Sequence, residues 1–146
     1  MASTGRAINR LAFGLCLGGL VFALAGPATA QTATSVSLVL QDFSDCTNAN
    51  VKDNGGGAPG GTVNILRNAD GTTSLKIGMS AVPSTTYHFF QKCVRLLGDI
   101  TTDEVGLGEA ILTPPAGAVG QVFAFDSYPE GAPAVNKFQS VRVRLP

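Results

Sequence analysis

The sequence predicts an all-β fold, an antiparallel β-sandwich of about seven strands behind an N-terminal signal peptide. Beyond residue 30, nearly every window long enough for a helix contains Gly, Pro or clustered β-branched residues, which disfavours helices. Short segments instead alternate apolar and polar side chains with a period of two, as strands with one buried face do. Turn-forming residues separate these segments roughly every 8 to 12 residues, a spacing typical of sandwiches and barrels.

The N-terminal residues have the layout of a signal peptide. Arg6 and Arg10 precede an apolar run over residues 11–25, and a triplet of small residues ends at Ala30. We therefore expect cleavage after Ala30. The run is shorter than the roughly 20 residues that cross a bilayer, so no membrane span is expected after cleavage. A secreted, periplasmic or extracellular location follows.

The remaining chain, residues 31–146, has the length of one domain with one core. The precursor has ten acidic and ten basic residues. Loss of Arg6 and Arg10 leaves eight basic residues, a net charge of −2. These basic residues are scattered along the chain, so nucleic-acid binding is not expected.

The first three predicted strands each carry apolar side chains at every second position, which gives them one buried face. They are residues 35–43, with Val36, Leu38 and Leu40 on that face, residues 62–67, with Val63 and Ile65, and residues 74–79, with Leu75 and Ile77.

The fourth predicted strand, residues 86–97, is apolar on both faces around Phe89 and Phe90, as a central strand would be. In the last predicted strand, Arg142 and Arg144 alternate with apolar residues and should form a solvated face. The three strands that follow the fourth are residues 109–113, 121–126 and 138–145.

The segments between these strands contain turn residues. Asp70 and Gly71 tolerate the positive φ of a tight hairpin turn. Residues 101–106 should form a second hairpin loop, and residues 114–117 contain two prolines that interrupt the chain again. The glycine-rich residues 48–61 cannot bury much apolar area, so we expect a mobile surface loop there.

Two cysteines, Cys46 and Cys93, remain after the expected cleavage. An even pair in an exported protein favours a disulfide over a metal site or a nucleophile. Closing a loop of this length is worth roughly 4 kcal/mol in the chain-entropy model.

Pro83-x-Thr85-x-Tyr87, followed by an apolar strand, resembles the pattern that leads into a late strand of fibronectin type III and related immunoglobulin-like sandwiches. In that family the tyrosine forms a corner, because its hydroxyl bonds to the chain a few residues earlier. The resemblance implies the same structural role for Tyr87, with a contact near residues 81–83.

Residues for catalysis are sparse. His88 is the single histidine. A lone histidine more often has a structural role than a catalytic one, because a catalytic base needs partner side chains. The sequence contains no Gly-x-Ser-x-Gly motif and no phosphate-binding glycine loop, so we expect no enzyme activity and no cofactor. Asp42, Asp45 and Asp53 could contact calcium, but their spacing matches no calcium loop, and no metal site is predicted.

These observations favour an exported, non-enzymatic module that binds an unknown macromolecule or forms part of a cell surface. A small-ligand or carbohydrate-binding module is the second hypothesis, with Tyr128 as the one aromatic expected in a loop. Self-association through open strand edges, involving the apolar segment before Phe43, is the third.

Overall fold

The computed structural model describes residues 33–55, 57–131 and 137–145, and the proposed signal peptide lies outside these ranges. The described part is all-β, as the sequence predicts. Its ten strands are β1 (Ala33–Leu40), β2 (Gly60–Arg67), β3 (Thr73–Ser80), β4 (Thr86–Gln91), β5 (Arg95–Thr101), β6 (Leu107–Leu112), β7 (Val122–Phe123), β8 (Phe125–Tyr128), β9 (Phe138–Ser140) and β10 (Val143–Arg144). In the described ranges, no helix has the length and apolar character needed to cross a membrane.

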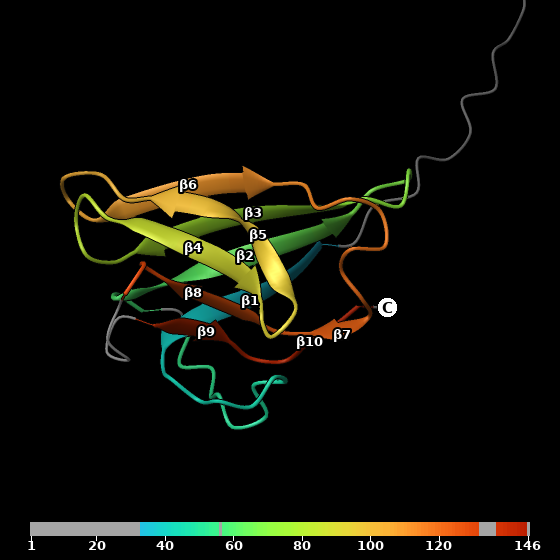
Figure 1. The fold of residues 1–146 in the computed structure, drawn as a ribbon, viewed down its shortest axis with the longest axis horizontal. Helices are drawn as coiled ribbons and strands as arrows, with labels where there is room; N and C mark the ends of the chain where they lie inside the picture. The colour runs from blue at the N-terminus through green and yellow to red at the C-terminus, as the bar shows by residue number, and fades with distance from the viewer. Residues whose placement is uncertain (1–32, 56, 132–136, 146) are drawn as a thin grey trace, which may run out of the picture.

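Eight strands form one continuous antiparallel sheet in the order β5-β4-β8-β9-β1-β2-β3-β6, and β10 pairs with β7 separately. The large sheet curls until its two end strands, β5 and β6, lie side by side (Figure 1). The predicted two-sheet sandwich is therefore corrected to a nearly closed barrel.

Two glycines allow the end strands to approach. A Cβ atom on Gly98 of β5 would lie 2.6 Å from the Leu112 side chain of β6. A Cβ atom on Gly108 of β6 would lie 3.1 Å from the Ile100 side chain of β5. Because each glycine leaves room for a large side chain from the other strand, the seam closes by side-chain packing, without ladder hydrogen bonds between β5 and β6.

Three predicted strands are each divided in two, and the first of them, residues 86–97, turns back on itself so that its halves belong to the antiparallel hairpin β4–β5. The predicted strand 86–97 breaks at residues 92–94, where Cys93 has a positive φ of 57° and Val94 N donates to Gln91 O over 3.0 Å. Residues 121–126 and 138–145 divide into β7 and β8, and into β9 and β10. The period-two alternation of apolar and polar residues continues across these breaks, so the alternation alone does not reveal where one strand ends and the next begins.

The two predicted hairpin loops behave differently. The turn at Asp70 and Gly71 joins paired strands, β2 and β3, and Gly71 has a φ of 82°. The loop after Thr101 also turns the chain back, with the Asp103 carboxylate accepting from Leu107 N at 2.9 Å. However, β5 and β6 are not hydrogen-bonded neighbours, so this loop connects the two ends of the sheet instead of forming a hairpin.

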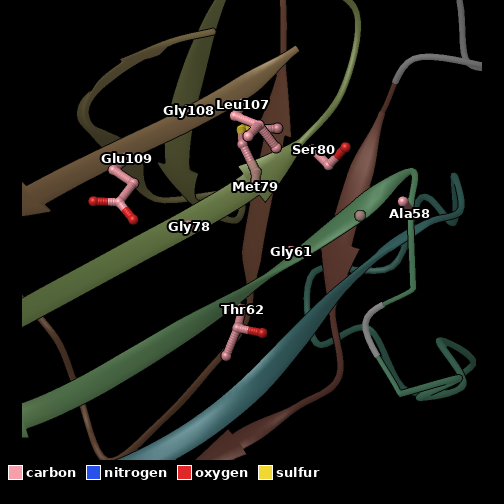
Figure 2. A pocket seen from close by; sticks show the side chains of 10 residues that line it. Ala58, Gly61, Thr62, Gly78, Met79, Ser80, Leu107, Gly108 and Glu109 are labelled. Carbon is pink, nitrogen blue, oxygen red and sulfur yellow. The ribbon is translucent and has the colours of Figure 1, made fainter. Parts of the chain in front are cut away.

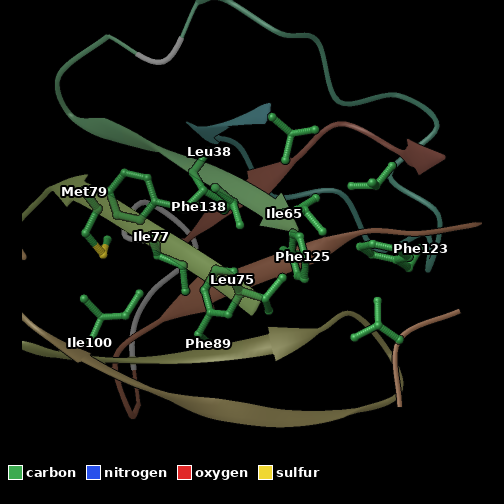
Figure 3. Close-up of a cluster of buried hydrophobic side chains, with 14 of the residues drawn as sticks. Leu38, Ile65, Leu75, Ile77, Met79, Phe89, Ile100, Phe123, Phe125 and Phe138 are labelled. Carbon is green, nitrogen blue, oxygen red and sulfur yellow. The ribbon is translucent and has the colours of Figure 1, made fainter. Parts of the chain in front are cut away.

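The core fills the inside of the curled sheet (Figure 3). Alternate residues of β2 and β3 point inward, as the pattern predicts, and Phe89 packs against Phe125 with ring centroids 4.9 Å apart. Tyr87 meets Phe138 edge to face at 5.7 Å. The largest fully buried apolar residues are Leu38, Ile65, Leu75, Ile77, Tyr87, Phe89, Ile100, Phe125 and Phe138.

Candidate functional site

The segment between β1 and β2 is fastened to the body of the protein. Cys46 and Cys93 form a disulfide with their Cα atoms 5.5 Å apart, as the even cysteine pair predicts. Asn48 and Val51 are buried, and Arg142 donates to the Thr47 hydroxyl over 2.9 Å. The expectation of a mobile loop over residues 48–61 is therefore wrong for its first residues. The high glycine content of that segment suggests a mobile loop, but Asn48 and Val51 within it are buried.

Beneath this segment lies a set of buried polar side chains that we call the lysine cluster: Asn48, Lys92, Asp126 and Gln139. Lys92 is only 5% exposed, and its Nζ donates to the Phe43 carbonyl and to Asn48 Oδ1. Asp126 Oδ1 lies 3.6 Å from the same nitrogen. The register of β4, β8 and β9 places Asp126 opposite both Phe90 and Gln139, on the outer face of the barrel.

Hydrogen bonds hold the amides of the cluster in place. Asn48 Nδ2 donates to Ser140 O at 2.7 Å and to Phe125 O at 3.3 Å, which orients Asn48 Oδ1 toward Lys92. Gln139 accepts from Phe43 N at 2.9 Å and donates to Phe43 O at 3.0 Å. The cluster is thus a rigid arrangement of one cation, one carboxyl group and two carboxamides.

Burial raises the pKa of Asp126 above its ordinary value of 3.8, although the nearby charge of Lys92 opposes this effect. Among the described residues, Asp126 Oδ1 has no hydrogen-bond partner. The carboxyl group therefore holds a proton to higher pH in the folded protein than in the unfolded chain, and it can give or take a proton inside the cluster.

This shift predicts a pH dependence of stability. The pKa of Asp126 is higher in the folded protein than in the unfolded chain. The contribution of Asp126 to the free energy of unfolding therefore decreases as pH rises from about 4 to the folded pKa. Asp126→Asn removes this contribution. Denaturant titrations at a series of pH values should show the variant gaining relative to the wild type across that window, and a constant difference would contradict the prediction.

A second group of side chains, the aromatic patch, lies on the outer face beside the cluster and comprises His88, Phe90, Tyr128, Val94 and Leu96. The alternation of β4 turns Tyr87 and Phe89 inward and His88 and Phe90 outward. The rings of Phe90 and Tyr128 stack with centroids 4.8 Å apart and an interplanar angle of 15°. Tyr128 ends β8, so its predicted position in a loop is corrected.

Charged residues border the aromatic patch. His88 Nδ1 lies 2.7 Å from Asp99 Oδ1, and both side chains are partly exposed. Lys137 Nζ lies 5.1 Å from the centroid of the Tyr128 ring and 2.9 Å from Asp42 Oδ1. The Lys137 pKa is raised mainly by its hydrogen bond to Asp42. The rim thus offers donors and acceptors around an apolar centre.

A shallow pocket of about 270 Å³ adjoins the patch between the turn after β4 and Tyr128. Its lining includes the apolar Phe90, Val94 and Leu96 and the charged Lys92 and Asp126. Val94 is 59% exposed and Leu96 50% exposed, which is unusual for aliphatic side chains standing beside an aromatic stack.

His88 forms an acid and base pair with Asp99, but a hydrolase would also need a nucleophile. Cys93, considered from the sequence as such a group, is oxidised to the disulfide. Asp99 and Phe90 contact His88, and Tyr128 lies opposite it in the ladder of β4 and β8. The contact with Asp99 orients the imidazole on the surface.

A groove of about 330 Å³ crosses the ends of β2, β3 and β6 (Figure 2). Its floor contains Gly60, Gly61, Gly78 and Gly108, so the backbone itself is the surface there. Glu109 is the one charged residue in its lining, which is otherwise small or apolar. The groove therefore lacks the convergent polar groups of a catalytic site.

The three aspartates considered for calcium have separate partners. Asp42 pairs with Lys137, Asp45 Oδ2 accepts from Ala49 N at 2.7 Å, and Asp53 Oδ1 accepts from Gly55 N at 2.8 Å. The Asp45 contact lowers the pKa of that carboxyl group. Within the described ranges, no three His, Cys, Asp or Glu side chains form a group able to hold a metal ion.

Two structural contacts bear on the other sequence predictions. The Tyr87 hydroxyl accepts from Val82 N at 3.2 Å, within the stretch that the resemblance implies. β1 pairs with β2 along its length and with β9 over Leu38–Leu40, so exchange of this strand between copies would disrupt both pairings.

Sequence reasoning missed Asn48, Lys92, Asp126, Phe90 and Asp99. The outward phase of Phe90 and its neighbour His88 was readable from the alternation of residues 86–91 once Tyr87 was placed inside. The lysine cluster had no local signal, because its members are distant in sequence and meet only through the disulfide and the β8 pairing. No protein-family model matches the chain, and no curated protein matches it either.

Proposed function

We propose that this chain is an exported, non-enzymatic module that binds a macromolecule at or outside the cell surface through the aromatic patch. The observation that carries the proposal is the outward Phe90 and Tyr128 stack beside exposed Val94 and Leu96. Aromatic residues surrounded by apolar contacts and a polar rim are typical of the energetic centre of a protein interface.

The form of the surface favours a large partner. Small molecules usually bind in concave sites that enclose most of their area, whereas the pocket beside Tyr128 is shallow. Phe90 and Tyr128 pack face to face, and the flanking Val94 and Leu96 are exposed. A flat or gently convex partner would cover this area more completely than a small ligand.

We include export of the chain from the cytoplasm in the proposed role. The predicted leader directs the chain out of the cytoplasm, and disulfides such as Cys46–Cys93 persist in oxidising compartments. The resemblance of the Pro83 to Tyr87 segment to fibronectin type III and immunoglobulin-like domains agrees with a binding role outside the cell.

Carbohydrate is the second candidate ligand. A sugar ring could lie over the edge of the Phe90 and Tyr128 stack, with His88, Asp99 and Lys137 near enough to the rim to bond hydroxyl groups. Glycan binding that is lost in Tyr128→Ala, with no protein partner recovered, would favour this candidate.

The test compares binding of labelled protein to the intact surface and shed matrix of the producing cells. Phe90→Ala combined with Tyr128→Ala should weaken binding by about tenfold or more, since truncation of central aromatics commonly costs over 1 kcal/mol. Ile111→Ala, on an exposed site of β6, is the matched control and should bind as the wild type does. Equal binding by the double variant and the wild type, with both folded by circular dichroism, would contradict the proposed surface.

A further inference from the structure

The lysine cluster contains the components of a covalent reaction that neither the proposed binding role nor the fold requires. A primary amine, a carboxamide and a carboxyl group meet in a buried place, supplied by the turn after β4, the segment after β1, and β8. Lys92 Nζ donates to Asn48 Oδ1, and Asp126 Oδ1 is 3.6 Å from the same nitrogen.

We propose that Lys92 and Asn48 join spontaneously through an amide bond between Nζ and Cγ, with Asp126 moving the protons and ammonia leaving. The Nζ–Cγ bond forms and the Cγ–Nδ2 bond breaks. Lysine enters as an ammonium group and gives up two protons, and the departing amide nitrogen takes up two and leaves as ammonium. No electrons are transferred, so no oxidant or further reactant is needed.

The geometry holds the two reacting groups together before the reaction. Asn48 Nδ2 is fixed by the carbonyl groups of Ser140 and Phe125, so the carbonyl side of its amide faces Lys92. The disulfide joins Cys46, two residues before Asn48, to Cys93, the residue after Lys92. Holding two groups in contact in this way replaces a bimolecular encounter with an intramolecular step.

Burial favours amide formation over competing hydrolysis. Lys92, Asn48 and Asp126 are each nearly inaccessible to solvent, so water reaches the acyl carbon less readily than it would reach an exposed amide. Ammonium that escapes is diluted in the solvent, which makes the reverse step slow.

Asp126 is placed to move the protons. The lysine must be neutral to attack, and Asp126 Oδ1, which has no hydrogen-bond partner among the described residues, lies 3.6 Å from its nitrogen. Its raised pKa makes it a better base than an ordinary aspartate, and it can then return a proton to the departing nitrogen. If Lys92 and Asp126 formed only an unreactive ion pair, no proton transfer between them would be required.

The test is a peptide map of protein recovered from outside the producing cell, after full reduction and alkylation of the cysteines. Trypsin should release a branched peptide in which residues 31–52 are joined to residues 77–95, lighter than the sum of its parts by one ammonia. Cleavage after Lys92 fails in that peptide because its amine is acylated. Separate peptides 31–52 and 77–92, with Asn48 and Lys92 intact, would overturn the proposal.

An intact mass alone is insufficient, since cyclisation of an N-terminal Gln31 also releases ammonia. That reaction leaves residues 31–52 unbranched, so fragmentation of the peptides separates the two events. Because alkylated cysteines cannot hold the peptides together, a surviving link is not the disulfide.

Variants assign the role of Asp126. Asp126→Asn keeps the shape of the side chain and should yield folded protein without the branched peptide. Arg144→Met removes an exposed surface cation on β10 and should leave the branch intact. Branching in Asp126→Asn equal to the wild type would overturn the role of Asp126, and the wild-type map decides on the bond itself even if a variant fails to fold. None of these results depends on the aromatic patch, so this inference and the proposed function can fail separately.

Discussion

Replacing Phe89 with alanine is expected to lower the free energy of unfolding by about 3–5 kcal/mol, the usual cost of removing a buried aromatic ring. Phe89 is fully buried on β4 and packs against Phe125 with a centroid distance of 4.9 Å. The barrel closes around this pair, and the hydrogen-bonded neighbours of β4 cannot move inward to fill the space. Denaturant unfolding followed by near-ultraviolet circular dichroism would measure the loss.

The matched control is Ile111→Ala on β6. The Ile111 side chain is 72% exposed, so its truncation should change stability by no more than about 0.5 kcal/mol. A similar loss for both variants would mean that Phe89 does not occupy the interior position described here.

Replacing Gly61 with alanine is expected to destabilise the protein by about 1–3 kcal/mol, because the new methyl group overpacks the sheet. A Cβ atom there would lie 2.4 Å from the Gly78 carbonyl oxygen and 3.0 Å from Met79 Cα. Both atoms belong to the backbone of β3, so no side-chain rotation relieves the contact. β2 and β3 would have to separate at the end of the ladder that borders the groove of Figure 2.

Gly78→Ala is the control in the same groove. A Cβ atom on Gly78 meets nothing within 4 Å, although Gly78 lies opposite Thr62, the neighbour of Gly61. We expect this variant to be neutral or slightly more stable than the wild type, because alanine restricts the unfolded chain. Thermal unfolding of the two variants in parallel checks the difference, and the reverse order of stability would contradict the packing at Gly61.

The sequence by itself determined where most strands lie and which of their residues face the core. Val63, Ile65, Leu75 and Ile77 are buried as their alternation predicts, because a pleated strand places every second side chain on the same face. The even cysteine pair likewise predicts the disulfide. These features depend on local periodicity or on the chemistry of a residue type, and both are readable without coordinates.

Only the tertiary structure decided that the sheet curls into a nearly closed barrel. Sandwich and barrel strands have the same alternation, and the difference depends on contacts such as that between Gly98 and Leu112. The lysine cluster and the aromatic patch also form only in the tertiary structure. Asn48, Lys92 and Asp126 come together through strand pairing and the disulfide, and interactions between such distant residues leave no periodic signal in the sequence.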